Sequence, residues 1–173
     1  MKLLKAGKVI TIVMEIIAII GAALSLGMTV MAFVNPQRLL ENGTFRVNGL
    51  DITKPLHLIE NPSLPMAIVF LTGAVVIGIT ALMVHRMHGI IVETMAGKPF
   101  QPCTVKWMKQ IGYCAVAGPL VGAVMSIVAM LLSVDGLHAT LDLSGLLTGV
   151  LVLCLTQVFA YGLELQKDVD GLL

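Results

Sequence analysis

Charged residues are scarce in this sequence. Of its 173 residues, 12% are Asp, Glu, Lys or Arg, which is about half the fraction in a typical soluble domain. So low a fraction cannot cover the water-facing surface of a soluble protein of this length. The net charge of +1 and the lack of a basic run argue against direct binding of nucleic acid. We therefore expect an integral membrane protein, with the lipid bilayer as its first partner.

Sequence signatures of catalysis are also absent. The chain has no glycine-rich phosphate loop, no Gly-x-Ser-x-Gly and no His-Glu-x-x-His motif. Its 3 cysteines are Cys103, Cys114 and Cys154, and they form no Cys-x-x-Cys pair of a thiol oxidoreductase. We predict that the protein is not an enzyme, and no catalytic, cofactor-binding or metal-binding residue is predicted.

Four apolar stretches are long enough to cross a bilayer. They cover about residues 9–34, 64–84, 111–134 and 143–163, and each has 20 residues or more. At 1.5 Å per residue, helices of this length span the roughly 30 Å hydrocarbon layer. Period-two alternation, which would indicate strands, is missing. The sequence predicts an all-α membrane protein, a single domain over 1–173 with four transmembrane helices in an up-down bundle.

The distribution of Lys and Arg predicts the orientation of these spans. With four spans, both termini share a side with the segment between the second and third spans, and this side holds 8 of the 11 basic residues. The other side holds Arg38, Arg46 and Lys54. Because basic residues accumulate in cytoplasmic segments, we expect a multi-pass protein of the inner (plasma) membrane with cytoplasmic N- and C-termini.

The predicted exported loop, residues 35–63, contains a hairpin pattern. Polar and apolar residues alternate over residues 44–53 around Asn48 and Gly49, a pair that suits a type I′ turn. We therefore expect a small β-hairpin in this loop. It either packs as a lid on the bundle or binds a ligand, and we favour the lid.

On the cytoplasmic side, the helical pattern continues beyond the expected membrane thickness. Apolar residues recur at helical spacing after His85, Gly97 suits a helix C-cap, and Pro102 suits the first turn of the next helix. We expect a cytoplasmic helical hairpin over 85–110 and a cytoplasmic tail over 164–173.

Small residues recur every four positions within the apolar stretches. Gly118 and Gly122 share one face of the third stretch, and Gly145 and Gly149 share one face of the fourth. Such residues let helix backbones approach one another. The pattern predicts close packing in the bundle and leaves open a homo-oligomer formed through a remaining face.

Glu15 is the carboxylate placed deepest in an apolar stretch. Gln157 lies at a similar predicted depth in the fourth stretch, so the two are expected to form an intramembrane polar pair. The alternatives are that Glu15 is neutral or reaches toward Lys8, or that it serves a proton or cation site. His85 and His88 have a spacing that metal ligands use, but a structural site needs four ligands.

Two segments carry a family resemblance. The turn made by Gly97, Lys98, Pro99 and Phe100 and the closing segment 158–166 resemble the bacterial family of domain of unknown function 2975. The resemblance implies four spans and no settled activity. It also implies a helix-turn-helix regulator as a cytoplasmic partner. The final residues 168–173 keep the family's acidic character but lack its Thr.

Two functions therefore remain open. The first is a non-enzymatic membrane signalling or scaffolding partner of a cytoplasmic protein, which would use the hairpin 85–110 and the acidic tail. The alternative is a small transporter or channel that uses the polar site at Glu15 and Gln157.

Overall fold

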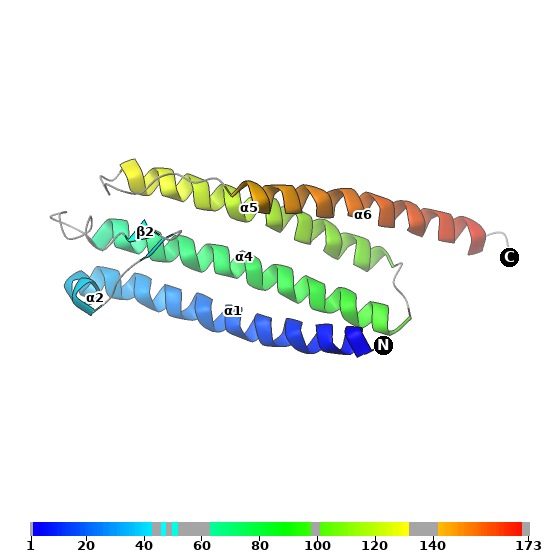
Figure 1. Cartoon of the computed structure of the whole chain (residues 1–173), viewed down its shortest axis with the longest axis horizontal. Coiled ribbons are helices and arrows are strands. Elements are labelled where there is room, and N and C mark those ends of the chain that lie inside the picture. The colour runs from blue at the N-terminus through cyan, green and yellow to red at the C-terminus, as the bar shows by residue number, and fades with distance from the viewer. Residues whose placement is uncertain are drawn as a thin grey trace. The chain divides into compact units, whose positions relative to one another are not determined.

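A computed structural model shows a chain built mainly of long α-helices. It describes residues 2–42, 46–47, 50–51, 63–97, 101–131 and 142–170. In chain order (Figure 1) the elements are α1 (Lys2–Val34), α2 (Pro36–Asn42), β1 (Arg46–Val47), β2 (Leu50–Asp51), α4 (Ser63–Met95), α5 (Pro102–Leu131) and α6 (Leu143–Asp170).

Within the described residues, three helices are long and apolar enough to cross a membrane. They cover Leu4–Val34, Ser63–Met95 and Leu143–Val169. These apolar helices indicate a multi-pass membrane protein. α5 contains most of the predicted stretch 111–134, and its use as a fourth span remains a prediction.

The ends of α4 and α5 confirm two local predictions. α4 continues through His85 and ends at Met95, and Gly97 follows it with a φ of 76°. The Gly97 amide donates to the Thr94 carbonyl at 3.1 Å, as expected of a left-handed residue that closes a helix. Pro102 is the first residue of α5. Residues 98–100 of the family-like turn lie outside the described residues.

α2 was not predicted, because residues 35–63 were expected to be loop and hairpin. The Arg38 amide donates to the Asn35 side-chain oxygen at 3.4 Å, and Pro36 is the first helical residue. Asn before a helix and Pro at its first position are both favoured start signals. The first part of the predicted loop is therefore helical.

The chain divides into two compact units. Unit 1 comprises residues 1–18, 79–119 and 143–173, and unit 2 comprises residues 19–78 and 120–142. In unit 2, the Ser25 hydroxyl on α1 donates to the Phe70 carbonyl on α4 at 2.7 Å. Ala32 and Met66, 0% and 1% exposed, are the most buried apolar residues in the described part of this unit.

Unit 2 also contains the two short strands. β1 and β2 pair in antiparallel register, with Arg46 opposite Asp51 and Val47 opposite Leu50. This pairing falls inside the range predicted for the hairpin, and the rest of that range lies outside the described residues.

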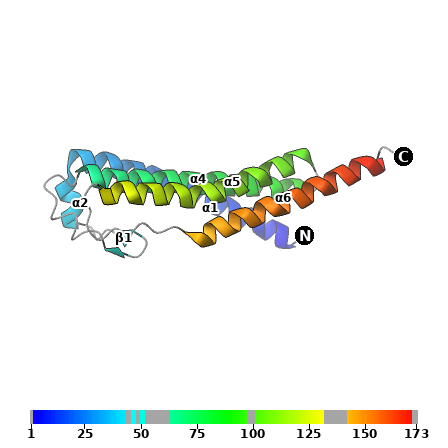
Figure 2. The same cartoon turned by 90° about the horizontal axis from the view of Figure 1, so that it is seen from above.

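Unit 1 is formed by the ends of α1, α4 and α5 together with α6 (Figure 2). A Cβ added at Gly89 of α4 would lie 2.9 Å from the Trp107 ring of α5. A Cβ added at Gly149 of α6 would lie 2.6 Å from a Val116 methyl group and 2.9 Å from the Val116 amide nitrogen of α5. Glycine at these points lets the helices approach without side-chain overlap.

These contacts correct part of the small-residue prediction. Gly149 does lie at a close helix contact, but a Cβ at Gly118 would meet nothing within 4 Å. Gly112, which the four-residue pattern did not single out, lies close enough to α6 that a Cβ would be 2.7 Å from the Leu153 side chain. Homo-oligomer formation stays a prediction.

We predict that Gly149→Ala destabilises the protein by about 1–3 kcal/mol, because the added methyl group must displace the α5 backbone at Val116. The matched control is Gly118→Ala, whose methyl group has room. It should change the stability by under about 1 kcal/mol, in the stabilising direction, through helix propensity. The measurement is the free energy of unfolding in detergent micelles. Equal effects of the two substitutions would contradict the assigned packing.

Candidate functional site

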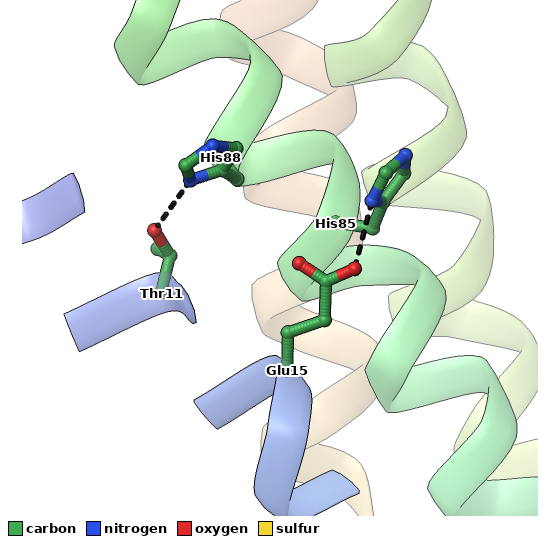
Figure 3. Close-up of polar contacts among 4 residues, drawn as sticks. All are labelled: Thr11, Glu15, His85 and His88. Carbon is green, nitrogen blue, oxygen red and sulfur yellow. Dashed lines mark hydrogen bonds and ion pairs between the residues drawn. The ribbon is translucent and has the colours of Figure 1, made fainter. Parts of the chain in front are cut away.

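Two polar contacts join α1 to α4 in unit 1 (Figure 3). Glu15 contacts His85, and Thr11, one turn earlier on α1, contacts His88, nearly one turn later on α4. Because the residue numbers rise along α1 as they fall along α4, the two helices run antiparallel here. Together the four side chains form a polar seam, defined as Thr11, Glu15, His85 and His88.

Glu15 and His85 form a hydrogen bond, which becomes an ion pair when His85 is protonated. The His85 Nδ1 donates to Glu15 Oε1 at 2.9 Å, and the side chains are 59% and 24% exposed respectively. An ion pair this open to its surroundings contributes only about 0.2–1 kcal/mol when those surroundings are aqueous. On this scale the pair contributes little to the stability of the fold.

The Thr11 contact is more deeply buried. The Thr11 side chain is 6% exposed, and its hydroxyl donates to the backbone of its own helix, with the Lys8 carbonyl at 2.9 Å and the Gly7 carbonyl at 3.1 Å. A hydroxyl has one proton and two lone pairs, so the oxygen accepts from His88 Nδ1, which lies 3.2 Å away.

The polar seam lies where the charge-free stretches of two helices end. α1 has no Asp, Glu, Lys, Arg or His from Ile16 to Val34, and α4 has none from Ser63 to Val84. Each stretch has about 20 residues, enough for the hydrocarbon layer. Glu15 immediately precedes the α1 stretch, and His85 immediately follows the α4 stretch. Glu15 thus lies next to the charge-free stretch of α1 and within the candidate span Leu4–Val34.

On α5, the boundary between the polar segment and the charge-free stretch lies at a similar level along the helix axes. The Gly89–Trp107 contact sets the register of α4 against α5, and one turn along the antiparallel pair Arg86 lies level with Gln110. The charge-free stretch of α5 begins at the next residue, Ile111.

α6 does not follow this pattern. Its Leu153 lies level with Gly112 of α5, but its charge-free stretch continues for ten more residues to Leu163, roughly 15 Å further along the helix. In both views the C-terminal end of α6 continues past the ends of the other helices of unit 1 (Figures 1 and 2). Its outer residues are exposed apolar side chains at helical spacing, namely Val158 (68%), Tyr161 (69%), Leu165 (57%) and Val169 (58%).

The residues predicted to form a polar pair have separate environments. Glu15 bonds to His85, whereas Gln157 is exposed on α6. Among the described residues, no hydrogen bond joins Glu15 to Gln157. The two histidines with metal-ligand spacing bond to different partners, and the described part of the chain contains no group of three or more His, Cys, Asp or Glu side chains able to hold a metal ion.

A sequence signal for the actual pairing does exist. Polar residues four apart on one apolar helix, Thr11 and Glu15, match polar residues three apart on another, His85 and His88. Such spacings place each pair on one helix face. Antiparallel packing of these faces would have predicted the polar seam.

We predict a measurable coupling between Glu15 and His85 and none between Glu15 and Gln157. A double-mutant cycle of Glu15→Ala and His85→Ala should give a coupling free energy of about 0.2–1 kcal/mol. The same cycle with Gln157→Ala is the control and should give a value within about 0.3 kcal/mol of zero. The observable is again the free energy of unfolding in micelles. Coupling to Gln157 alone would contradict the observed seam.

The chain has one clear relationship among known proteins. A family model described as "Protein of unknown function (DUF2975)" matches residues 51–171, which include α4, α5 and α6. No curated protein and no solved structure matches the chain. Because the match covers more than half of the sequence and agrees with the resemblance of the turn and closing segment, the chain belongs to the DUF2975 family of unknown function.

Proposed function

We propose that this protein is a four-span protein of the plasma membrane with cytoplasmic termini. In our proposal it acts without enzymatic activity as a scaffold or signalling partner of a cytoplasmic protein. The helix lengths support four spans, because α1, α4, α5 and α6 each contain a charge-free stretch of about 20 residues. The excess of basic residues on the side of the termini supports the orientation.

The observation that carries the proposed role is the exposed apolar end of α6. The four residues Val158, Tyr161, Leu165 and Val169 are more than half exposed, and the last two follow the end of the charge-free stretch. Spacings of three and four residues put them along one helix face. An apolar helix face outside the hydrocarbon layer is typical of a protein-binding surface.

Charge distinguishes this surface from its neighbours in unit 1. The hairpin 85–110 contains four basic residues and one acidic residue, Glu93. The end of α6 contains Glu164, Asp168 and Asp170 against Lys167. Basic and acidic segments next to an apolar stripe supply the orientation and selectivity that apolar contact lacks. A helix-turn-helix regulator is the partner that the family resemblance implies.

The alternative function, a small transporter or channel, has less support from the geometry. It relied on Glu15 and Gln157 facing a common polar path, but Glu15 bonds to His85 and Gln157 is exposed. Polar residues that line an intramembrane path are also expected away from the ends of the apolar stretches.

We predict that reporter proteins fused to the two termini both indicate a cytoplasmic location. A fluorescent protein that folds only in the cytoplasm should be bright when fused before Met1 or after Leu173. An alkaline phosphatase, active only after export, should be inactive at both positions and active when inserted after Asn42. Four spans put the termini on one side, and three put them on opposite sides. Opposite results at the two termini would therefore overturn the four-span plan.

We predict that the exposed face of α6 captures the cytoplasmic partner. The paired substitution Leu165→Ser and Val169→Ser should reduce the recovery of at least one cytoplasmic protein about tenfold, because each loss of about 1.4 kcal/mol in binding is a factor of ten. The measurement is cross-linking in intact cells, purification of the full-length chain and quantitative mass spectrometry.

The matched control for this experiment is the pair Gln166→Ser and Lys167→Ser, which changes exposed residues on the same turns of α6. It should leave recovery of the partner within about twofold. Identical captured proteins for wild type and for Leu165→Ser with Val169→Ser would end the proposed role.

A further inference from the structure

α6 carries a row of exposed side chains on the side opposite its contact with α5. The contact side includes Gly149, which lies against Val116 of α5, and Thr156, which is buried. At about 100° per residue, the members of the row lie within about 40° of one line on the other side of the helix. We call this row the outer face of α6, and it consists of Leu147 (64% exposed), Leu151 (56%), Cys154 (exposed), Val158 (68%) and Tyr161 (69%).

The spacing of the outer face is that of a coiled coil. Its members are separated by four, three, four and three positions, so the pattern repeats every seven residues. In a coiled coil, residues at this spacing form the core in which two helices interdigitate. A seven-residue repeat keeps such a row turned toward a partner helix that winds around it. The outer face therefore has the geometry to pack against one further helix over about four turns.

The outer face crosses the level at which α5 changes from polar to apolar. Leu153 lies level with Gly112 of α5, next to the start of the charge-free stretch of α5. Because the two helices are antiparallel, the part of α6 beyond Leu153 runs beside residues 102–110 of α5, which include two lysines. Leu151 therefore lies at the level of the apolar part of α5, and Val158 lies at the level of its polar part.

In the four-span arrangement proposed above, this position limits what covers the whole outer face. Lipid tails reach its apolar level but not the level of the α5 lysines, and a soluble protein reaches only the second. A membrane helix covers both levels when its own apolar stretch continues equally far. Among the helices that the structure describes, α1, α4 and α5 end their charge-free stretches at about one level, and α6 continues to Leu163.

We propose that the outer face of α6 binds the same face of a second copy of this chain, so that the two α6 helices form a parallel two-stranded coiled coil. Two copies inserted in one orientation have parallel α6 helices at the same level. A two-fold axis then brings each residue of the face opposite its equivalent, and each chain covers the extended apolar segment of the other. The proposal goes beyond the proposed role, because it concerns the assembly of the chain and not its cytoplasmic partner.

The pairing ends before the C-terminal end of α6. After Tyr161, the next two core positions of the seven-residue pattern are Leu165 and Asp168. Parallel helices would bring the two Asp168 carboxylates together, and facing like charges oppose association. The two helices therefore separate beyond Tyr161, which leaves Leu165 and Val169 exposed for the cytoplasmic partner.

Cys154, in the middle of the outer face, provides the test. Helix axes about 10 Å apart, with each Cα about 2.3 Å from its axis, put facing Cα atoms about 5 Å apart, a separation that a disulfide bridges. The full-length chain with Cys103→Ser and Cys114→Ser retains Cys154 alone and is oxidised in native membranes with copper phenanthroline. We expect a cross-linked species of twice the mass of the chain, which dithiothreitol converts back to monomer.

Single cysteines at other positions, each in a chain with no other cysteine, map the contact. Leu151→Cys and Val158→Cys lie on the outer face and should cross-link as Cys154 does. The matched control is Leu155→Cys, which lies between them in sequence, is 52% exposed and is turned about 80° away from the outer face. It should cross-link at least about fivefold less. Equal yields at these positions would indicate random collision and would overturn the proposal.

A second measurement does not depend on cysteine oxidation. Two copies of the full-length chain with different affinity tags are expressed together, and the recovery of one with the other is quantified. Leu151→Ala with Val158→Ala should reduce this recovery about tenfold, because both substitutions remove apolar contact from each copy. Val150→Ala with Leu155→Ala, at exposed positions beside the outer face, should change it by less than about twofold. Unchanged recovery for the first pair, or cross-linking of Cys154 only to a different protein, overturns the proposal.

The pair Leu165→Ser and Val169→Ser separates this proposal from the proposed role. It should reduce capture of the cytoplasmic partner and leave the yield of the Cys154 cross-link within about twofold. A cross-link that disappears together with the partner would mean that the partner bridges the two copies, and direct pairing of the α6 helices would be excluded. A cross-link that is absent from the wild-type membrane overturns the pairing and leaves the proposed role standing.

Discussion

Hydrocarbon offers no hydrogen-bond partner to an ionisable group, and this constraint orders the polar residues of the chain. In unit 1, α1 reaches its first ionisable residue at Glu15 and α4 at His85, and the two side chains meet at 2.9 Å. α5 changes from polar to apolar next to Gln110, which is level with Arg86. The charge-free stretches of three helices therefore end at about one level. Glu15 and His85 meet there because each is the first ionisable residue beside the charge-free stretch of its helix.

Close contacts at glycines join α4 to α5 and α5 to α6, whereas the contacts of Thr11 and Glu15 join α1 to α4. Lipid tails are as apolar as the side chains that they surround, so helices in a membrane associate through contact area and small residues. The Trp107 ring on Gly89 sets α4 against α5, and Val116 on Gly149 sets α5 against α6. With the α4–α5 register set, Arg86 lies at about the level of Gln110 along the helix axes.

Much of the fold is local and could be predicted from the sequence. Long apolar stretches predicted the helices, and Gly97 and Pro102 predicted where α4 and α5 end and begin. The partner of Glu15 could not be predicted from one stretch, because it depends on the register between two helices. Four-residue spacing singled out Gly118 and Gly149 alike, and only the packed structure separates them. α2 had a readable start signal in Asn35 and Pro36, which the expected loop obscured.

The C-terminal end of α6 continues past the ends of the other helices of unit 1, and this bears on what covers its apolar face. In the four-span arrangement that we propose, Glu164 and Lys167 lie outside the hydrocarbon layer, so the exposed Leu165 and Val169 would meet water or another molecule. Lipid could cover them only if the helix turned to lie along the membrane surface. α6 is one continuous helix from Leu143 to Asp170, without a proline to redirect it. In the arrangement that we propose, its end would leave the bilayer along the direction of the span. A protein surface could reach such a helix end, and this supports the proposal of a cytoplasmic partner.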